Sequence, residues 1–117
     1  MWTKREKVIT DFKEANDYII GMYNFHDYVL GHMEVNNTEI KVTVEEDRNT
    51  KDNKNSLIWD FAFNGFSSLK FNIDCYCKSY IYEIEIKDNS NINISLSNGY
   101  INFKTKGITL GIPKRIE

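Results

Sequence analysis

A chain of 117 residues with 41% hydrophobic and 27% charged residues can bury a hydrophobic core, so its composition excludes an intrinsically disordered polypeptide. The formal net charge of −2 provides no overall positive field to attract a phosphate backbone, and we therefore expect no binding to nucleic acid. No apolar run approaches the roughly 18 residues of a membrane-spanning helix, so we also expect no membrane insertion.

The cysteines and the N-terminal residues indicate a cytoplasmic protein. Cys75 and Cys77 are separated by one residue, a spacing that closes too small a ring to hold a fold together. A secreted domain of this size usually carries several disulfide pairs. The charged first residues are not followed by the apolar segment of a signal peptide. We expect the chain to fold without a disulfide, a metal or a cofactor.

The N-terminal region has the pattern of an amphipathic helix over residues 3–23. Thr3 and Glu6 have the residue types and the spacing of a capping box, in which each side chain accepts a hydrogen bond from the backbone amide of the other residue. Apolar residues then recur at helical spacing: Val8, Phe12, Ala15, Ile19 and Met22. The stripe is widened by Ile9, Ile20 and Tyr23. These residues predict a helix that packs on the rest of the protein.

From Asp27 the apolar period changes to two, which is typical of β-strands. We expect about eight strands, at 29–35, 40–45, 57–63, 69–73, 80–86, 92–96, 101–103 and 108–112. Tight turns are predicted at Asn36-Asn37, Asn64-Gly65 and Asn98-Gly99. Short connections without crossover helices predict antiparallel pairing, so residues 27–112 should form an antiparallel meander. Strands 57–63 and 69–73 should then be hairpin partners.

The pattern therefore predicts an α+β fold in a single domain over residues 1–117. Either a strongly curved antiparallel sheet wraps over the N-terminal helix, or two sheets form a sandwich with the helix at one open side. In the strand at 80–86, an inward face is expected to carry Tyr80, Tyr82, Ile84 and Ile86. Glu83 and Glu85 should point the other way.

His26 and Asp27 lie where the helix gives way to the first strand. An aspartate beside a histidine can orient the imidazole in a general-base or metal site. The structural interpretation is a turn, in which Asp27 caps backbone amides and Phe25 fills the core. We favour the turn, because adjacent residues of an extended segment point to opposite sides and should not pair directly.

Cys75 and Cys77, together with Asp74, His26 and His32, are the residues from which a metal site could be assembled. Both sulfurs would face the same side of a strand, but a zinc site normally needs four ligands from spaced pairs. Buried, unreactive thiols are the preferred interpretation. A Cys–His nucleophilic pair is geometrically possible, but no motif around these residues supports it.

Acidic side chains recur along the predicted strands, at Glu45, Glu46, Asp47, Asp60, Asp74, Glu83 and Glu85. Such residues usually form solvated faces or protect the edges of sheets. Strand pairing could also bring two or three of these runs together into an anionic patch for a basic protein. No phosphate-binding loop, nucleophile elbow or paired-carboxylate motif is present in the sequence.

Two short segments carry a family resemblance. They are Asn24-Phe25-His26-Asp27-Tyr28-Val29, at the entry to the first strand, and Trp59-Asp60-Phe61-Ala62-Phe63-Asn64-Gly65-Phe66. With the isoleucine-rich tail, the chain resembles small bacterial proteins, some of which are grouped as predicted immunity proteins of polymorphic toxin systems. The resemblance implies a non-enzymatic bacterial protein and supplies no catalytic residues.

The first functional hypothesis is a non-enzymatic protein-binding domain, such as an immunity protein that occludes a basic toxin. Its partner-binding residues would be Glu83 and Glu85, followed by Glu45, Glu46 and Asp47. The alternative is a small-ligand or metal-binding domain with a site near His26 and the Cys75/Cys77 strand. A small hydrolase has the least support.

Overall fold

The computed structural model describes residues 5–46, 57–74, 78–88 and 90–113. They include the α-helix α1 (Phe12–Gly21) and the short 3-10 helix η1 (Tyr23–Phe25). The strands, in chain order, are β1 (Arg5–Ile9), β2 (Val29–Val35), β3 (Glu39–Glu45), β4 (Ile58–Asn64), β5 (Ser67–Ile73), β6 (Ile81–Lys87), β7 (Asn91–Leu96), β8 (Gly99–Lys104) and β9 (Gly107–Pro113).

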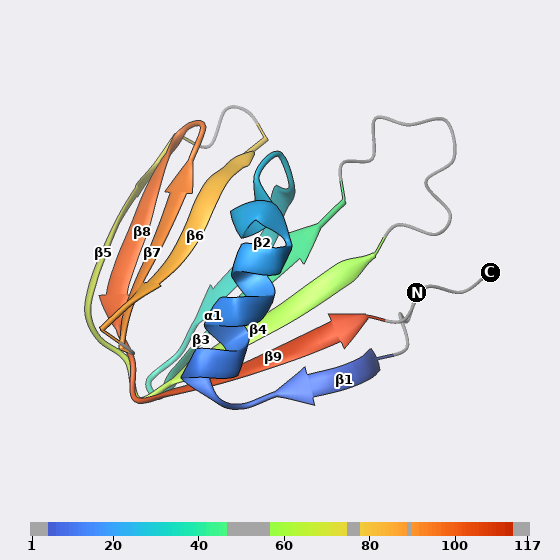
Figure 1. Cartoon of the computed structure of the whole chain (residues 1–117). Helices are drawn as coiled ribbons and strands as arrows, with labels where there is room; N and C mark the ends of the chain where they lie inside the picture. The colour runs from blue at the N-terminus through green and yellow to red at the C-terminus, as the bar shows by residue number, and fades with distance from the viewer. Residues whose placement is uncertain (1–4, 47–56, 75–77, 89, 114–117) are drawn as a thin grey trace.

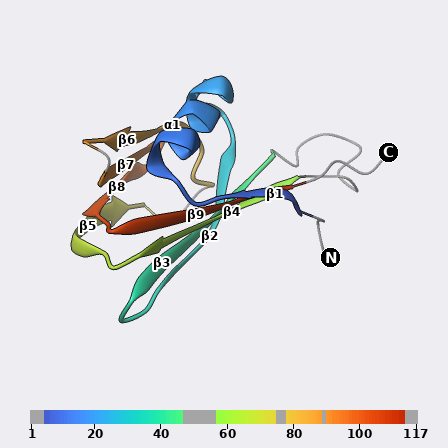
Figure 2. The same ribbon diagram turned by 60° about the horizontal axis from the view of Figure 1, so that its bottom comes forward.

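The strands form two antiparallel sheets, of five strands in the order β1-β9-β4-β3-β2 and of four strands in the order β5-β8-β7-β6. The two sheets meet at one end and diverge from it, and α1 lies between them at one open side (Figure 1; Figure 2). The expected α+β fold is therefore confirmed. Of the two arrangements that the sequence allowed, the observed one is the pair of sheets with the helix at an open side.

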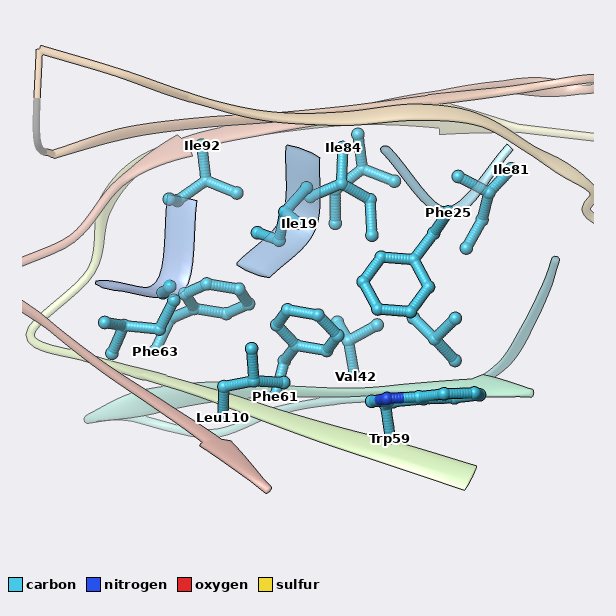
Figure 3. Packing of buried hydrophobic residues seen from close by; sticks show 14 of the residues in the cluster. Ile19, Phe25, Val42, Trp59, Phe61, Phe63, Ile81, Ile84, Ile92 and Leu110 are labelled. Atoms are coloured by element: carbon cyan, nitrogen blue, oxygen red, sulfur yellow. The ribbon is translucent and has the colours of Figure 1, made fainter. Parts of the chain in front are cut away.

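The hydrophobic core fills the space between the inner faces of the two sheets (Figure 3). The five-stranded sheet contributes the buried residues Ile9, Ile40, Val42, Val44, Trp59, Phe61, Phe63, Ile108, Leu110 and Ile112. The four-stranded sheet contributes Ile81, Ile84, Ile92, Ile94, Leu96, Ile101 and Phe103. Ala15 and Ile19 of α1 are buried in the same cluster, so the helix shares one core with both sheets.

The chain crosses between the sheets at two adjacent turns, from β4 to β5 and from β8 to β9 (Figure 1). Thr105, which is only 4% exposed, places its hydroxyl 2.8 Å from the carbonyl oxygen of Asn64. The amide of Lys106 donates to the same oxygen, and the amide of Gly65 donates to the carbonyl of Thr38. These bonds satisfy backbone groups at the crossing and link the end of β4 to the turn that precedes β9.

The expected helix over residues 3–23 is wrong at its start. Residues Arg5–Ile9 form β1, which pairs with β9, and α1 begins at Phe12. The N-cap is Asp11, whose side chain accepts a hydrogen bond of 2.9 Å from the amide of Glu14. Thr3 lies outside the described residues. Ile9 is buried and Val8 is 48% exposed, because neighbouring residues of a strand point to opposite faces.

The meander is interrupted after β4, after β5 and after β8, because each of these strands is followed in the chain by a strand with which it does not pair. β4 does not pair with β5, although Asn64-Gly65 suggested a hairpin, because β4 lies between β3 and β9 in the other sheet. Gly65 instead has a φ of 68° in the turn that crosses between the sheets. The last strand, β9, returns to lie between β1 and β4. The hairpins β2–β3 and β7–β8 form as expected.

Tyr82 was expected on the inward face of β6 and is instead 62% exposed. The pairing of β6 with β7 shifts between Ile81 and Glu83, so a β-bulge inserts Tyr82 as an extra residue. Ile81 takes the inward position, while Ile84 stays buried as expected. A bulge moves every residue on one side of it to the opposite face of the sheet. The alternation of apolar and polar residues in the sequence does not reveal where a bulge lies.

Candidate functional site

The segment that leaves α1 has an uncommon backbone conformation. Tyr23, Asn24 and Phe25 have φ angles of 54°, 57° and 58°, and Asp27 follows with 71°. Three consecutive residues thus lie in the left-handed region, which costs on the order of 1–2 kcal/mol for each residue with a side chain. Asparagine adopts this region readily, whereas tyrosine and phenylalanine adopt it rarely. Such strain persists only where surrounding contacts impose it, and it clusters at functional sites.

Phe25 provides much of the stabilisation that holds this turn. Its side chain is fully buried, and its ring makes edge-on contacts with Tyr28, Trp59 and Phe61. Figure 3 shows Phe25 between the two sheets. Burial of a phenylalanine is worth roughly 1.5–3 kcal/mol, which offsets a large part of the strain. The structural role proposed for Phe25 is therefore confirmed.

The turn is also fixed to the start of β6 by backbone hydrogen bonds. The amide of Asp27 donates to the carbonyl of Ile81 at 2.9 Å, and the amide of Ile81 donates to the carbonyl of Tyr28 at 2.7 Å. Val29 and Tyr80 form an isolated antiparallel bridge beside them. The start of β2 thereby joins the two sheets and holds residues 23–28 against β6.

His26 binds both β6 and its own neighbour. Its Nδ1 lies 2.9 Å from the carbonyl oxygen of Tyr82. Because a carbonyl only accepts hydrogen bonds, Nδ1 carries the proton and donates it. Its Nε2 lies 3.5 Å from Oδ1 of Asp27, so the expectation that these two side chains would not pair is wrong. The reason is the positive φ of Asp27, which turns its side chain out of the extended geometry.

Three large side chains around this turn are exposed: Ile20, Tyr23 and Tyr82, at 58%, 84% and 62%. His26 lies beside Tyr82, with ring centroids 5.5 Å apart in an edge-on arrangement. We call the side chains of Ile20, Tyr23, His26 and Tyr82 the aromatic corner. They come from the end of α1, from the turn after it and from β6, which contact one another.

The sequence suggested that Ile20, Tyr23 and Tyr82 belong to the core, and the structure shows that they do not. Helical periodicity assigns Ile20 and Tyr23 to the margin of the buried stripe, but the helix ends at Gly21. Asn24 was the available signal, because asparagine visits the left-handed region more readily than most residues that carry a side chain. Even so, these residue types do not predict three consecutive residues in the left-handed region.

Glu83 and Glu85 lie on the outer face of β6, opposite the buried Ile84, as expected. Oε1 of Glu85 lies 3.9 Å from Nζ of Lys87 and accepts a long hydrogen bond of 3.4 Å from Asn93. The carboxylate of Glu83 has no hydrogen bond or ion pair within the described part of the chain. Glu83 directly follows Tyr82, so it adds a negative charge at the rim of the aromatic corner.

The other acidic residues do not join this surface. Glu45 lies on the outer face of the five-stranded sheet, and its carboxylate approaches the Cα of Gly31 at the β-bulge of β2. Oε1 of Glu46 accepts a hydrogen bond of 2.9 Å from the amide of Leu57, which gives Glu46 a structural role. Asp47 lies outside the described residues. The predicted acidic residues are therefore divided between two sheets.

The described residues provide no metal-binding group. Cys75 and Cys77 lie outside them, and elsewhere no three His, Cys, Asp or Glu side chains are close enough to hold an ion. His32 is on β2, where its Nε2 lies 3.8 Å from Oε2 of Glu34, and is not brought near His26. None of the described helices has the length and apolar character that crossing a membrane requires.

The fold is that of an α+β protein with two antiparallel sheets, and exposed aromatic side chains lie at the end of α1 and on β6. Comparison of the chain with protein-family models, with curated proteins and with solved structures finds no match.

Proposed function

We propose that this chain is a non-enzymatic protein-binding domain that recognises a basic protein through the aromatic corner and the neighbouring Glu83. The observation that carries the proposal is the strained turn that keeps Tyr23 exposed. A tyrosine that is 84% exposed gains little from burial, so the strain of its backbone is not offset by packing of its own side chain. A requirement for Tyr23 at the surface would explain why this conformation is retained.

The composition of the corner suits a protein interface. Tyrosine is among the residues that contribute most to binding energy at interfaces, while isolated surface charges mainly affect association rate. The corner is also held rigid, because His26 and the backbone of residues 27–28 are bonded to β6. A rigid surface loses little conformational entropy when a partner binds. Glu83 and Glu85 would favour a partner with a positive surface.

The partner that we propose is a bacterial toxin, and the chain would act in the cytoplasm as its immunity protein. Support comes from the Phe-His-Asp entry at Phe25, His26 and Asp27, from the two closely spaced cysteines and from the acidic rim of the corner. In this proposal the chain blocks the toxin by covering its surface and performs no chemistry.

The sharpest test is Tyr23→Gly. Glycine relieves a strain of roughly 1–2 kcal/mol at this left-handed position. A gain of roughly 0.4–1 kcal/mol in unfolded-chain entropy offsets part of that relief. We therefore expect the free energy of unfolding to stay constant or rise, by up to about 1.5 kcal/mol. Affinity for the proposed toxin partner should fall by about tenfold or more, as measured by isothermal titration calorimetry.

Three further variants complete the test. Tyr82→Ala should also weaken binding, whereas Phe71→Ala should not, because Phe71 is similarly exposed, at 58%, but lies on β5 at the opposite edge of the same sheet. Glu83→Lys should slow association, and more strongly at low salt. If Tyr23→Gly and Tyr82→Ala both bind the toxin as tightly as the native chain, the aromatic corner is not the interface.

A further inference from the structure

Each sheet ends in two edge strands, and three of these four edges are covered or interrupted in the described part of the chain. The edge of β6 is bonded to the turn after α1, where the amide of Asp27 donates to the carbonyl of Ile81. The start of β2 is bonded to the segment before β6, through the amide of Leu30 and the carbonyl of Ser79, and its pairing then shifts at a β-bulge. β1 is five residues long and is also bulged. Covering segments, bulges and short length are common ways to keep an edge strand from pairing further.

The fourth edge, β5, contains a regular stretch with an exposed aromatic side chain (Figure 1). Its bulge lies between Ser67 and Lys70, and the pairing with β8 then runs without a shift from Lys70 to Ile73. Phe71 lies in this stretch and pairs with the fully buried Ile101, so both side chains face the core side of the sheet. Phe71 is nevertheless 58% exposed, because β5 has a neighbouring strand on one side only. β5 thus presents apolar surface at an edge that no described strand covers.

The backbone of Phe71 directs its hydrogen-bonding groups away from β8. The amide of Asp74 donates to the carbonyl of Asn98 at 2.9 Å, one residue beyond the pair of Ile73 and Gly99. Hydrogen-bonded and non-hydrogen-bonded pairs alternate along an antiparallel ladder, so Ile73 and Phe71 both occupy non-hydrogen-bonded positions relative to β8. The N–H and C=O of Phe71 therefore face the open edge, where they can pair with one more strand.

We infer that this additional strand is β5 of a second copy of the chain, paired antiparallel about Phe71. In this register Phe71 exchanges two backbone hydrogen bonds with the partner's Phe71. Leu69 lies opposite the partner's Ile73, so apolar side chains meet on the core side of the sheet. On the outer side Lys70 lies opposite the partner's Asn72, so no like charges face each other. Pairing about Lys70 would instead place the two ammonium groups opposite each other, which is unfavourable.

The dimer joins the two four-stranded sheets into one continuous sheet. A single pair of strands buries less surface than the roughly 1,200 Å² of a stable complex, so the dimer is weak and forms only at high concentration. β6 lies at the opposite edge of each sheet from β5. The two aromatic corners therefore stay at the far ends of the joined sheet and remain accessible. The dimer does not depend on the proposed function of the corner.

The test is analytical ultracentrifugation of the full chain at concentrations up to about 1 mM. We expect the weight-average mass to rise with concentration from 13.8 kDa toward twice this value. Phe71→Ala should weaken the dimer by about fivefold or more, because it removes the central aromatic pair. Val35→Ala is the matched control, since Val35 is 45% exposed on the edge strand β2. A chain that stays monomeric over this range, or a dimer that Val35→Ala weakens more than Phe71→Ala does, would overturn the proposal.

Two variants of Asn72 test the register without altering the apolar side of the sheet, because Asn72 is exposed on the outer face and pairs with Tyr100. Asn72→Glu places a carboxylate opposite the partner's Lys70 twice in each dimer and should tighten it by about threefold or more at low salt. Asn72→Lys places two ammonium groups together and should weaken the dimer by a similar factor. If both substitutions weaken the dimer, pairing about Phe71 is excluded. If neither changes it, β5 is not the interface.

The dimer and the aromatic corner can be tested separately. Tyr23→Gly should leave the dimer unchanged, because η1 contacts β6 at the opposite edge of the sheet from β5. Phe71→Ala should weaken the dimer and leave the intrinsic affinity of each corner for the proposed toxin partner unchanged. Loss of the dimer in Tyr23→Gly would place the interface at the corner and overturn pairing through β5. A monomeric native chain would leave the proposed function of the corner unaffected.

Discussion

Gly31 and Gly99 both lie where another group approaches the Cα atom closely, but the approaching groups differ. A Cβ atom on Gly31 would overlap the carboxylate of Glu45, which is the far end of a flexible side chain. A Cβ atom on Gly99 would overlap the carbonyl oxygen of Asn72, which belongs to the backbone of β5. A side chain can move aside, whereas a backbone group can move only if the β5–β8 register is disturbed.

We therefore expect Gly99→Ala to destabilise the protein more than Gly31→Ala. Overpacking against backbone should lower the free energy of unfolding by about 1–3 kcal/mol at Gly99. At Gly31 the loss should be smaller, because the Glu45 side chain can change its rotamer whereas the β5 backbone cannot move in the same way. Urea unfolding of the two variants measures both values. A larger loss for Gly31→Ala would show that the Glu45 carboxylate is fixed in place.

At the residue scale, the sequence predicts side chains well where one local rule applies. Asn36 was expected in a turn, and its Oδ1 accepts hydrogen bonds from the amides of Thr38 and Glu39. Glu83 and Glu85 face outward because they alternate with isoleucines on one continuous strand. Tyr82 could not be placed, because the bulge beside it depends on the pairing with β7 and not on its own neighbours.

At the scale of elements, the most informative difference is the N-terminal strand. Val8, Ile9 and Thr10 are β-branched, which favours a strand, but helical spacing links Val8 to Phe12 and Ala15 equally well. Val8 and Ile9 form a strand because they pair with the edge of β9. A partner 100 residues away in the chain cannot be inferred from local periodicity. The helix therefore starts at the second capping sequence, Asp11 to Glu14, and not at the first.

Asp11→Ala tests this start. The substitution removes the acceptor for the amide of Glu14, and loss of an N-cap typically costs about 1 kcal/mol. Thr3→Ala is the matched control, because Thr3 was the cap expected for a helix over residues 3–23. We expect the control to leave the free energy of unfolding unchanged within about 0.5 kcal/mol. If Thr3→Ala lowers the free energy of unfolding as much as Asp11→Ala does, the helix begins at Thr3 as the sequence predicted.

At the scale of the whole molecule, three features join the two sheets: the shared core, the turns around Thr105 and the bridge from β2 to β6. Phe25 lies where two of these features meet, the shared core and the bridge, because its turn is bonded to β6 and its ring packs on Trp59 and Phe61 of β4. The turn that carries the proposed binding surface is therefore fixed by the same contacts that join the two sheets. Strain in the turn is tolerated because the same residue completes the core of both sheets.

Phe25→Ala should consequently destabilise both sheets together. Truncation of a fully buried phenylalanine costs about 3–5 kcal/mol, since it removes apolar contacts and leaves a cavity. In native-state hydrogen exchange, we expect the slowest amides in the central strands β4, β9, β7 and β8 and the fastest in the edge strands β1 and β5. The variant should lower the protection of the central strands of both sheets by the same free energy. If protection falls in the five-stranded sheet alone, the two sheets unfold separately, and the bridge at Val29 and Tyr80 does not couple them.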